Sequence, residues 1–308
     1  MYPAPSIIIF TTLSGLGYGL AAVLGIGLLD AAAMATKVAW VMALALIAGG
    51  LISSTLHLGN PQRAWRAFSQ WRSSWLSREG VMAVVTFVPL TVSAWLCVIE
   101  GRYLPLPGLI GSALCVGTVF CTAMIYASLK SVQAWATPLT PLCYLLFSLG
   151  SGMVAATFFA CLGAGYGSAL AIASVLLLAA AWTAKWSWRR NMLRMRPLST
   201  PETATGLGGL GHVRLLERPH MTENYLTREM GFKVARKHAA KLWKLAVLVG
   251  AVLPTALLLL LLVVNWQAGW SDALVAGLAL LACMAGVFVE RWLFFAQARH
   301  AVMNYYGG

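Results

Sequence analysis

Charged side chains are scarce in this sequence of 308 residues: only 10% are Asp, Glu, Lys or Arg, and only 9 are acidic. A chain that is 60% hydrophobic, with a mean hydropathy of +0.77, cannot cover a water-soluble core with polar surface. Alternation of apolar and polar residues is also absent, which excludes a membrane β-barrel. The composition therefore predicts an all-α, polytopic membrane protein: a helix bundle within a lipid bilayer.

Metal-binding patterns are missing as well. The six cysteines lie in apolar runs without a Cys-x-x-Cys pair or a Cys/His cluster, so we expect small buried side chains and no metal in this chain. Four of the five histidines (His212, His220, His238 and His300) lie outside the apolar runs or at their very end, which argues against histidine pairs for a transmembrane haem. No signal peptide is expected, because the first apolar run is too long for one.

Apolar runs long enough to cross a membrane make up most of the chain. A helix spans a bilayer with about 20 apolar residues, and eight segments meet this length. The predicted spans are 5–29, 36–57, 78–100, 105–130, 138–162, 166–187, 242–266 and 271–296. Pro254 lies inside the seventh span and predicts a kink there, which membrane helices tolerate. Residues 1–308 are thus predicted to form a single integral membrane domain.

Two connecting segments are long enough to have structure of their own. Segment 59–77 interleaves arginines with aromatic residues, which predicts a short amphipathic piece along the membrane surface. The basic loop 188–241 lies between the sixth and seventh spans, and 222–244 has the spacing of an amphipathic helix. Its glycine-rich run 206–211 resembles a nucleotide-binding loop only superficially, because no βαβ unit fits around it.

Lysine and arginine are distributed unequally between the two sides of the predicted bundle. The termini share one side with the loops after the second, fourth and sixth spans, and that side holds 20 of the 22 basic residues. Because positive loops remain in the cytoplasm, both termini and the loop 188–241 are predicted to be cytoplasmic. The same topology explains the net charge of +13 without a nucleic-acid partner. Tryptophans near the span ends are typical of interfacial aromatic residues: Trp71, Trp75, Trp135, Trp186, Trp188, Trp243, Trp266 and Trp270.

Ionisable side chains at membrane depth are costly and suggest functional sites. His57 ends the second predicted span and Glu79 opens the third on the same side, so the two are expected to converge. A histidine exchanges protons near neutral pH, but the C-terminus of a helix alone would also favour His57, and its N-terminus would favour Glu79.

Two further pairs lie near the same side. Tyr126 and Lys130 end the fourth span, and Lys130 could equally extend to the membrane surface. Glu290 and Arg291 lie near the end of the last span, where the favoured role of Glu290 is a structural ion pair inside the bundle.

A quinone site requires an apolar slot, hydrogen-bonding groups for two carbonyls and protonatable side chains, because each turnover moves two protons with two electrons. His57, Arg63, Glu79 and Tyr126 could supply that set at one interface. Nothing in this chain would hold the electrons, so an electron-carrying partner is expected to dock.

The run His-Leu-Gly-Asn-Pro-Gln-Arg-Ala-Trp at 57–65, followed by Leu-Ser-Arg-Glu at 76–79, resembles the signature of dimethyl sulfoxide reductase anchor subunits. Tyr126, Trp135 and the Thr-Pro-Leu run at 140–142 also match. The resemblance implies an anchor that binds an iron-sulfur electron-transfer subunit and a molybdopterin catalytic subunit, and exchanges electrons with ubiquinone or menaquinone. It implies that His57 and Glu79 are catalytic residues of the quinone site, with Arg63 and Tyr126 as companions.

The long basic loop and the tail 290–300 depart from those anchors and look more like the membrane subunits of quinone-dependent sulfite dehydrogenases. This likeness implies a quinone-reducing subunit fed by cytoplasmic sulfite oxidation. One alternative is a quinol-oxidising anchor of a terminal reductase. Another is a secondary anion transporter, although no convincing internal repeat is present. A purely structural anchor would leave His57 and Glu79 without a task.

Overall fold

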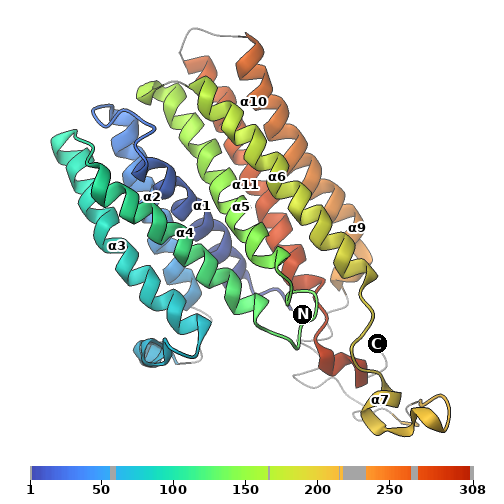
Figure 1. The fold of residues 1–308 in the computed structure, drawn as a ribbon. Helices are drawn as coiled ribbons and strands as arrows, with labels where there is room; N and C mark the ends of the chain where they lie inside the picture. The colour runs from blue at the N-terminus through green and yellow to red at the C-terminus, as the bar shows by residue number, and fades with distance from the viewer. Residues whose placement is uncertain are drawn as a thin grey trace.

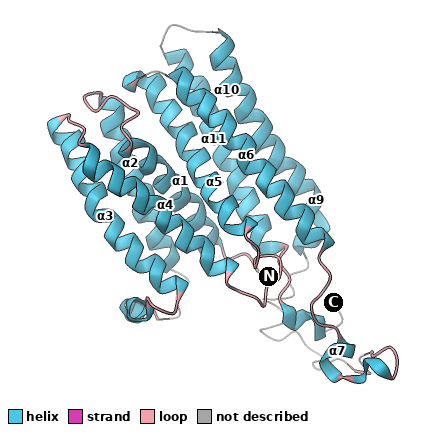
Figure 2. Ribbon diagram, viewed as in Figure 1, coloured by secondary structure: helices cyan, strands magenta, loops and turns pink. Residues whose placement is uncertain are grey.

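The computed structural model describes residues 2–55, 60–165, 167–214, 216–217, 234–264 and 270–305, and these residues form helices and loops without any strand (Figure 2). Eight candidate membrane spans confirm the predicted all-α fold. The spans are α1 (Pro5–Gly25), α2 (Met34–Thr55), α3 (Trp75–Glu100), α4 (Pro105–Ala127), α5 with the π-helix η2 (Leu139–Phe159, Ala160–Ala164), α6 (Gly167–Arg194), α9 with the π-helix η4 and α10 (Val234–Val247, Leu248–Val252, Leu253–Val264), and α11 (Trp270–Ala296). The shorter elements are η1 (Pro61–Gln70), α7 (Pro201–Thr205), η3 (Leu207–Gly209) and η5 (Ala301–Tyr305).

The spans form two halves that meet along α1 and α5. α1 packs against α2 and α4, α3 against α4, and on the other side α5 against α6 and α11 (Figure 1). α1 is buried along most of its length. Both termini and α7 lie at one end of the bundle, which we call the basic end because most lysines and arginines lie there (Figure 1).

The span boundaries differ from the predicted ones mainly in α6. This helix continues through Arg194, so the first residues of the predicted loop 188–241 are helical. Arginine, tryptophan and methionine are tolerated in a helix that has left the apolar layer. α9 begins at Val234, within the helix predicted at 222–244, while residues 218–233 of that prediction lie outside the described residues.

The segment after α2 is the predicted amphipathic piece, as a 3-10 helix. Trp65 and Phe68 of η1 and Trp71, which follows it, are exposed. The Ala67 carbonyl of η1 accepts a hydrogen bond from the Ser77 hydroxyl at the start of α3. Aromatic residues exposed beside a membrane helix suit the interface between lipid and water. The segment is therefore held against α3 at the basic end.

Pro254 distorts its span as predicted. Proline has no N–H and its ring displaces the carbonyl four residues earlier, and the chain forms the π-helix η4 immediately before Leu253. That displaced carbonyl, of Gly250, accepts a hydrogen bond of 2.9 Å from the Trp182 indole nitrogen. A neighbouring helix thus supplies the hydrogen bond that this carbonyl needs inside a membrane.

The two halves approach most closely at Gly19. A Cβ atom placed there would lie 1.9 Å from the Ser148 carbonyl oxygen, and one placed on Gly152 would lie 2.1 Å from the Gly19 carbonyl carbon. Small residues let helix backbones meet in this way, and dispersion rather than the hydrophobic effect then holds membrane helices together. Only glycine fits at these two positions.

Gly19→Ala is expected to force α1 and α5 apart and to destabilise the protein by about 1–3 kcal/mol or more, the usual cost of overpacking. Thermal unfolding in detergent measures the effect. Gly49→Ala is the control, since a Cβ atom on that helical glycine meets nothing within 4 Å. Equal midpoints for the two variants would contradict the close packing.

Candidate functional site

The structure describes three of the four residues predicted for the site. Glu79 is buried on α3, Tyr126 is half-buried on α4, and Arg63 is exposed on η1. His57 lies outside the described residues. Glu79 lies within electrostatic range of the Tyr126 phenol, so α3 and α4 bring these two residues together at the basic end.

Among the described residues, the side chain that holds Glu79 is Thr122 on α4. The Thr122 hydroxyl donates a hydrogen bond of 2.5 Å to the Glu79 carboxylate, and it also lies 3.1 Å from the carbonyl oxygen of Thr118. A hydroxyl can donate and accept. When Glu79 is ionised, Thr122 donates to it. When Glu79 is protonated, it donates to Thr122, which can then donate to the Thr118 carbonyl. The pair therefore accommodates Glu79 both with and without its proton.

Helical spacing places these groups on facing sides of α3 and α4. Glu79 and Thr86 are seven residues apart on α3, and Thr118 and Thr122 are four apart on α4, so each pair shares a face. The Thr86 and Thr118 hydroxyls are hydrogen-bonded at 2.9 Å, about two turns from Glu79. The signal in the sequence for Thr122 is therefore its spacing from Thr118, which places two polar residues on one face of α4. Composition alone does not show this.

Tyr126 belongs to an aromatic cluster between the two halves. Its ring centroid lies 5.4 Å from that of Trp135, 5.8 Å from that of Tyr144 and 5.2 Å from that of Phe295. Trp135 donates its indole N–H to the Phe294 carbonyl and is buried, as is Trp188. Trp135 and Trp188 thus pack inside the bundle, where Trp188 donates to the Thr140 hydroxyl, and not at the interfacial surface that was predicted for them.

Three charged side chains are buried together on α6 and α11. Lys185 Nζ lies 2.6 Å from Glu290 Oε1, and Arg291 Nε donates to Glu290 Oε2 at 2.5 Å. Lys185, Glu290 and Arg291 are at most 2% exposed, so the predicted structural ion pair of Glu290 is confirmed. We call these three residues the ion cluster.

Full-length comparison assigns the family. Residues 1–297 match the family described as DMSO reductase anchor subunit (DmsC). The chain belongs to this family. It is also 30% identical to a sulfite dehydrogenase subunit from Allochromatium vinosum, over 99% of either chain. No solved structure gives a significant match.

DmsC-family anchors pair in the membrane with an iron-sulfur subunit and a molybdopterin catalytic subunit, and they bind menaquinone or quinol. This chain is accordingly the membrane anchor of a DMSO reductase-type oxidoreductase. Within the described residues, no three His, Cys, Asp or Glu side chains are grouped as metal ligands. The six cysteines are free, five of them buried and Cys161 half-buried.

Lys185 of this DmsC-family chain was missed as a site residue. Lys185 lies only two residues before the predicted end of the sixth span, at 187, so its charge was grouped with those of the basic loop that follows. A lysine that follows an uncharged, mostly apolar run from 167 to 184 is, however, a charge at membrane depth, which marks a partner or a function. The acidic partner, Glu290, is more than 100 residues away in the chain and could not be paired with it from spacing.

Glu290→Gln is expected to lower the free energy of unfolding by about 3–5 kcal/mol, because it leaves two cations buried without an anion. Lys185→Met should cost less, since the Glu290–Arg291 pair remains. Unfolding midpoints of the purified variants show which substitution destabilises the protein more. Glu100→Gln is the control, because the exposed Glu100–Arg102 pair, 3.6 Å apart, is worth about 0–1 kcal/mol. A midpoint for Glu290→Gln equal to that of the control would exclude the ionised cluster.

Proposed function

We propose that this anchor reduces quinone with electrons from sulfite oxidation. The molybdopterin subunit would oxidise sulfite to sulfate, the iron-sulfur subunit would carry the electrons, and the quinone would take two protons from Glu79 and His57. Both termini and the basic end would face the cytoplasm of a bacterial inner membrane, with the partner subunits docked there.

The observation that carries the proposal is the buried Glu79–Thr122 pair. Quinone reduction requires a group that gives up a proton in an apolar site and is stable afterwards. Glu79 is buried, and its hydroxyl partner suits both of its protonation states.

The surroundings of Glu79 also suit a quinone. η1 packs on the first turns of α3 next to Glu79, and the Phe68 ring lies against Gly80. An aromatic surface suits a quinone ring, and the isoprenoid tail can remain in the lipid. Arg63 on η1 and the phenol of Tyr126 are the proposed hydrogen-bonding companions.

Sulfite is favoured as the electron donor by two observations. The sulfite dehydrogenase relative is 30% identical over 99% of either chain. The excess of lysine and arginine at the end that carries Glu79 supports cytoplasmic partners, through the positive-inside rule.

The family description favours a second direction of electron flow, from quinol to a terminal acceptor such as a sulfoxide. The same residues would then accept protons from the quinol. Membership of an anchor-subunit family argues against the anion transporter.

Glu79→Gln in the purified complex is expected to lower sulfite-to-quinone turnover by about 100-fold or more, the usual contribution of a positioned proton donor. Turnover with an artificial electron acceptor should be unchanged, because the molybdenum site lies in another subunit. His57→Ala should behave in the same way. Glu100→Gln is the matched control, since it makes the same change at the opposite end of α3.

Normal quinone kinetics in both Glu79→Gln and His57→Ala would refute the proposed site. A complex that reduces a sulfoxide with quinol, and does not oxidise sulfite, would establish the second direction instead. Co-purification in mild detergent with neither a molybdenum nor an iron-sulfur subunit would contradict both.

A further inference from the structure

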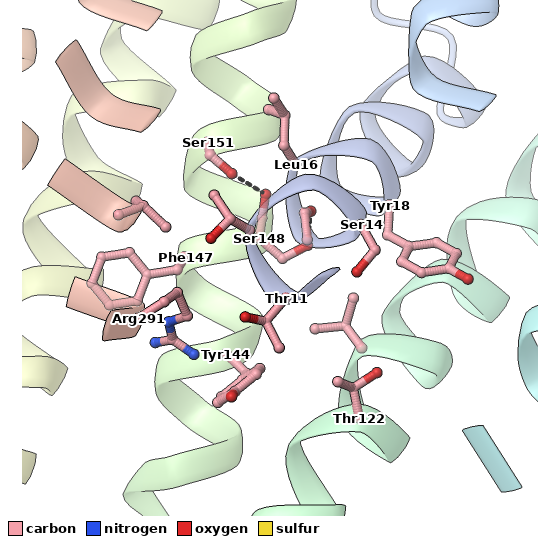
Figure 3. A pocket seen from close by; sticks show the side chains of 14 residues that line it. Thr11, Ser14, Leu16, Tyr18, Thr122, Tyr144, Phe147, Ser148, Ser151 and Arg291 are labelled. Atoms are coloured by element: carbon pink, nitrogen blue, oxygen red, sulfur yellow. Dashed lines mark hydrogen bonds between the residues drawn. The ribbon is translucent and has the colours of Figure 1, made fainter. Parts of the chain in front are cut away.

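A small polar cavity lies where the two halves of the bundle meet. Its volume is about 20 Å³, and it is lined by residues of α1, α4, α5 and α11. Figure 3 shows the Arg291 guanidinium beside the Tyr144 and Thr11 side chains, with Thr122 and Tyr18 on the other side. The cavity thus lies between the ion cluster, through Arg291, and Glu79, through Thr122.

Some polar groups around the cavity have hydrogen-bond partners and others do not. Thr11 and Ser14 donate to carbonyls of their own helix, at 2.9 Å and 2.6 Å. Four other side chains that line it each carry a polar atom with no hydrogen-bond partner in the part of the chain that the structure describes: Thr12 Oγ1, Tyr18 OH, Tyr144 OH and Arg291 Nη2. These four side chains are each at least nine-tenths buried.

Four unpartnered polar atoms around one space are unusual in a folded protein, because a buried polar group without a partner is costly. A cavity of about 10–15 Å³ holds one water molecule, and a buried water makes about three hydrogen bonds. Both the volume and the number of available partners fit one water.

We propose that the cavity binds an internal water molecule between Arg291, Tyr144 and Thr12, and that this water passes protons to Glu79 through Thr122. The site is formed by side chains from both halves of the bundle.

Arg291 determines how the water molecule is oriented. A guanidinium donates hydrogen bonds and cannot accept them, so the water oxygen faces Arg291 Nη2 and its hydrogens point to acceptors elsewhere. The hydroxyls of Thr122 and Tyr18, on the Glu79 side, are such acceptors (Figure 3).

The relay rests on the proposed function, whereas the water site does not. After Glu79 gives its proton to a reduced quinone oxygen, its carboxylate takes the proton of the Thr122 hydroxyl. Thr122 takes one from the water in the same step. This leaves a hydroxide beside Arg291, which takes up one proton from the surrounding solution and becomes water again. The net change is one proton taken from the solution, so no charge remains on Thr122 or on the water.

Two neighbouring threonines give a matched test of the water. Thr12→Val removes an unpartnered hydroxyl, and Thr11→Val removes one that is bonded to its own helix. With water present, Thr12→Val breaks a hydrogen bond and should lower the unfolding midpoint of the complex by about 2–4 °C relative to Thr11→Val. With a dry cavity the same change removes an unsatisfied group and raises the midpoint, which would overturn the proposal.

Tyr144→Phe tests the relay. Quinone-dependent turnover should fall about tenfold, less than in Glu79→Gln, and its solvent deuterium isotope effect should rise, with artificial-acceptor activity unchanged. Unchanged quinone turnover in Tyr144→Phe, with Glu79→Gln inactive, would overturn the relay while the proposed quinone site stands. If Glu79→Gln were also fully active, both the relay and the quinone site would fail. The unfolding midpoints of Thr12→Val and Thr11→Val would still decide whether the water is bound.

Discussion

Polar groups inside a bilayer have no bulk water to bond, and this constraint decides where each polar side chain of the bundle lies. Many buried hydroxyls turn back to a carbonyl of their own helix, as those of Thr11 and Ser14 do, and so require little from a neighbouring helix. The acids cannot be satisfied in this way, because a carboxylate needs donors. Glu79 takes its donor from α4, and Glu290 takes one from α6. The two acids therefore tie distant helices together at the basic end.

The ion cluster depends on the aromatic residues around it as much as on its own charges. Two cations share one carboxylate, so part of the positive charge needs other stabilisation. Lys185 Nζ lies 3.5 Å from the centroid of the Trp188 ring, and the Arg291 guanidinium lies 4.1 Å from that of Tyr144. Cation–π contacts of this kind are strongest when water is excluded. The aromatic residues that pack around Tyr126 therefore also compensate the charge buried beside them.

Hydropathy was enough to predict the eight spans, because length and apolar content act within one helix. It also placed Glu79 at membrane depth. It could not predict how each helix is rotated about its axis, which depends on contacts between residues far apart in the sequence. Burial of Trp135, the pairing of Lys185 with Glu290 and the cavity all depend on that rotation. The π-helix before Pro254 had a local cause and could be anticipated, but its hydrogen bond from Trp182 could not.

The closest contact between the two halves also orients the cavity. Thr12 lies seven residues before Gly19, two helical turns along the same face of α1, and Tyr144 lies four residues before Ser148 on the same face of α5. The backbone contact that places Gly19 against Ser148 therefore turns Thr12 and Tyr144 towards each other near the basic end. A side chain at Gly19 would separate these faces as well as the helices. The small residues of α1 are thus part of the proposed proton path, because they hold its two sides within reach of one water molecule.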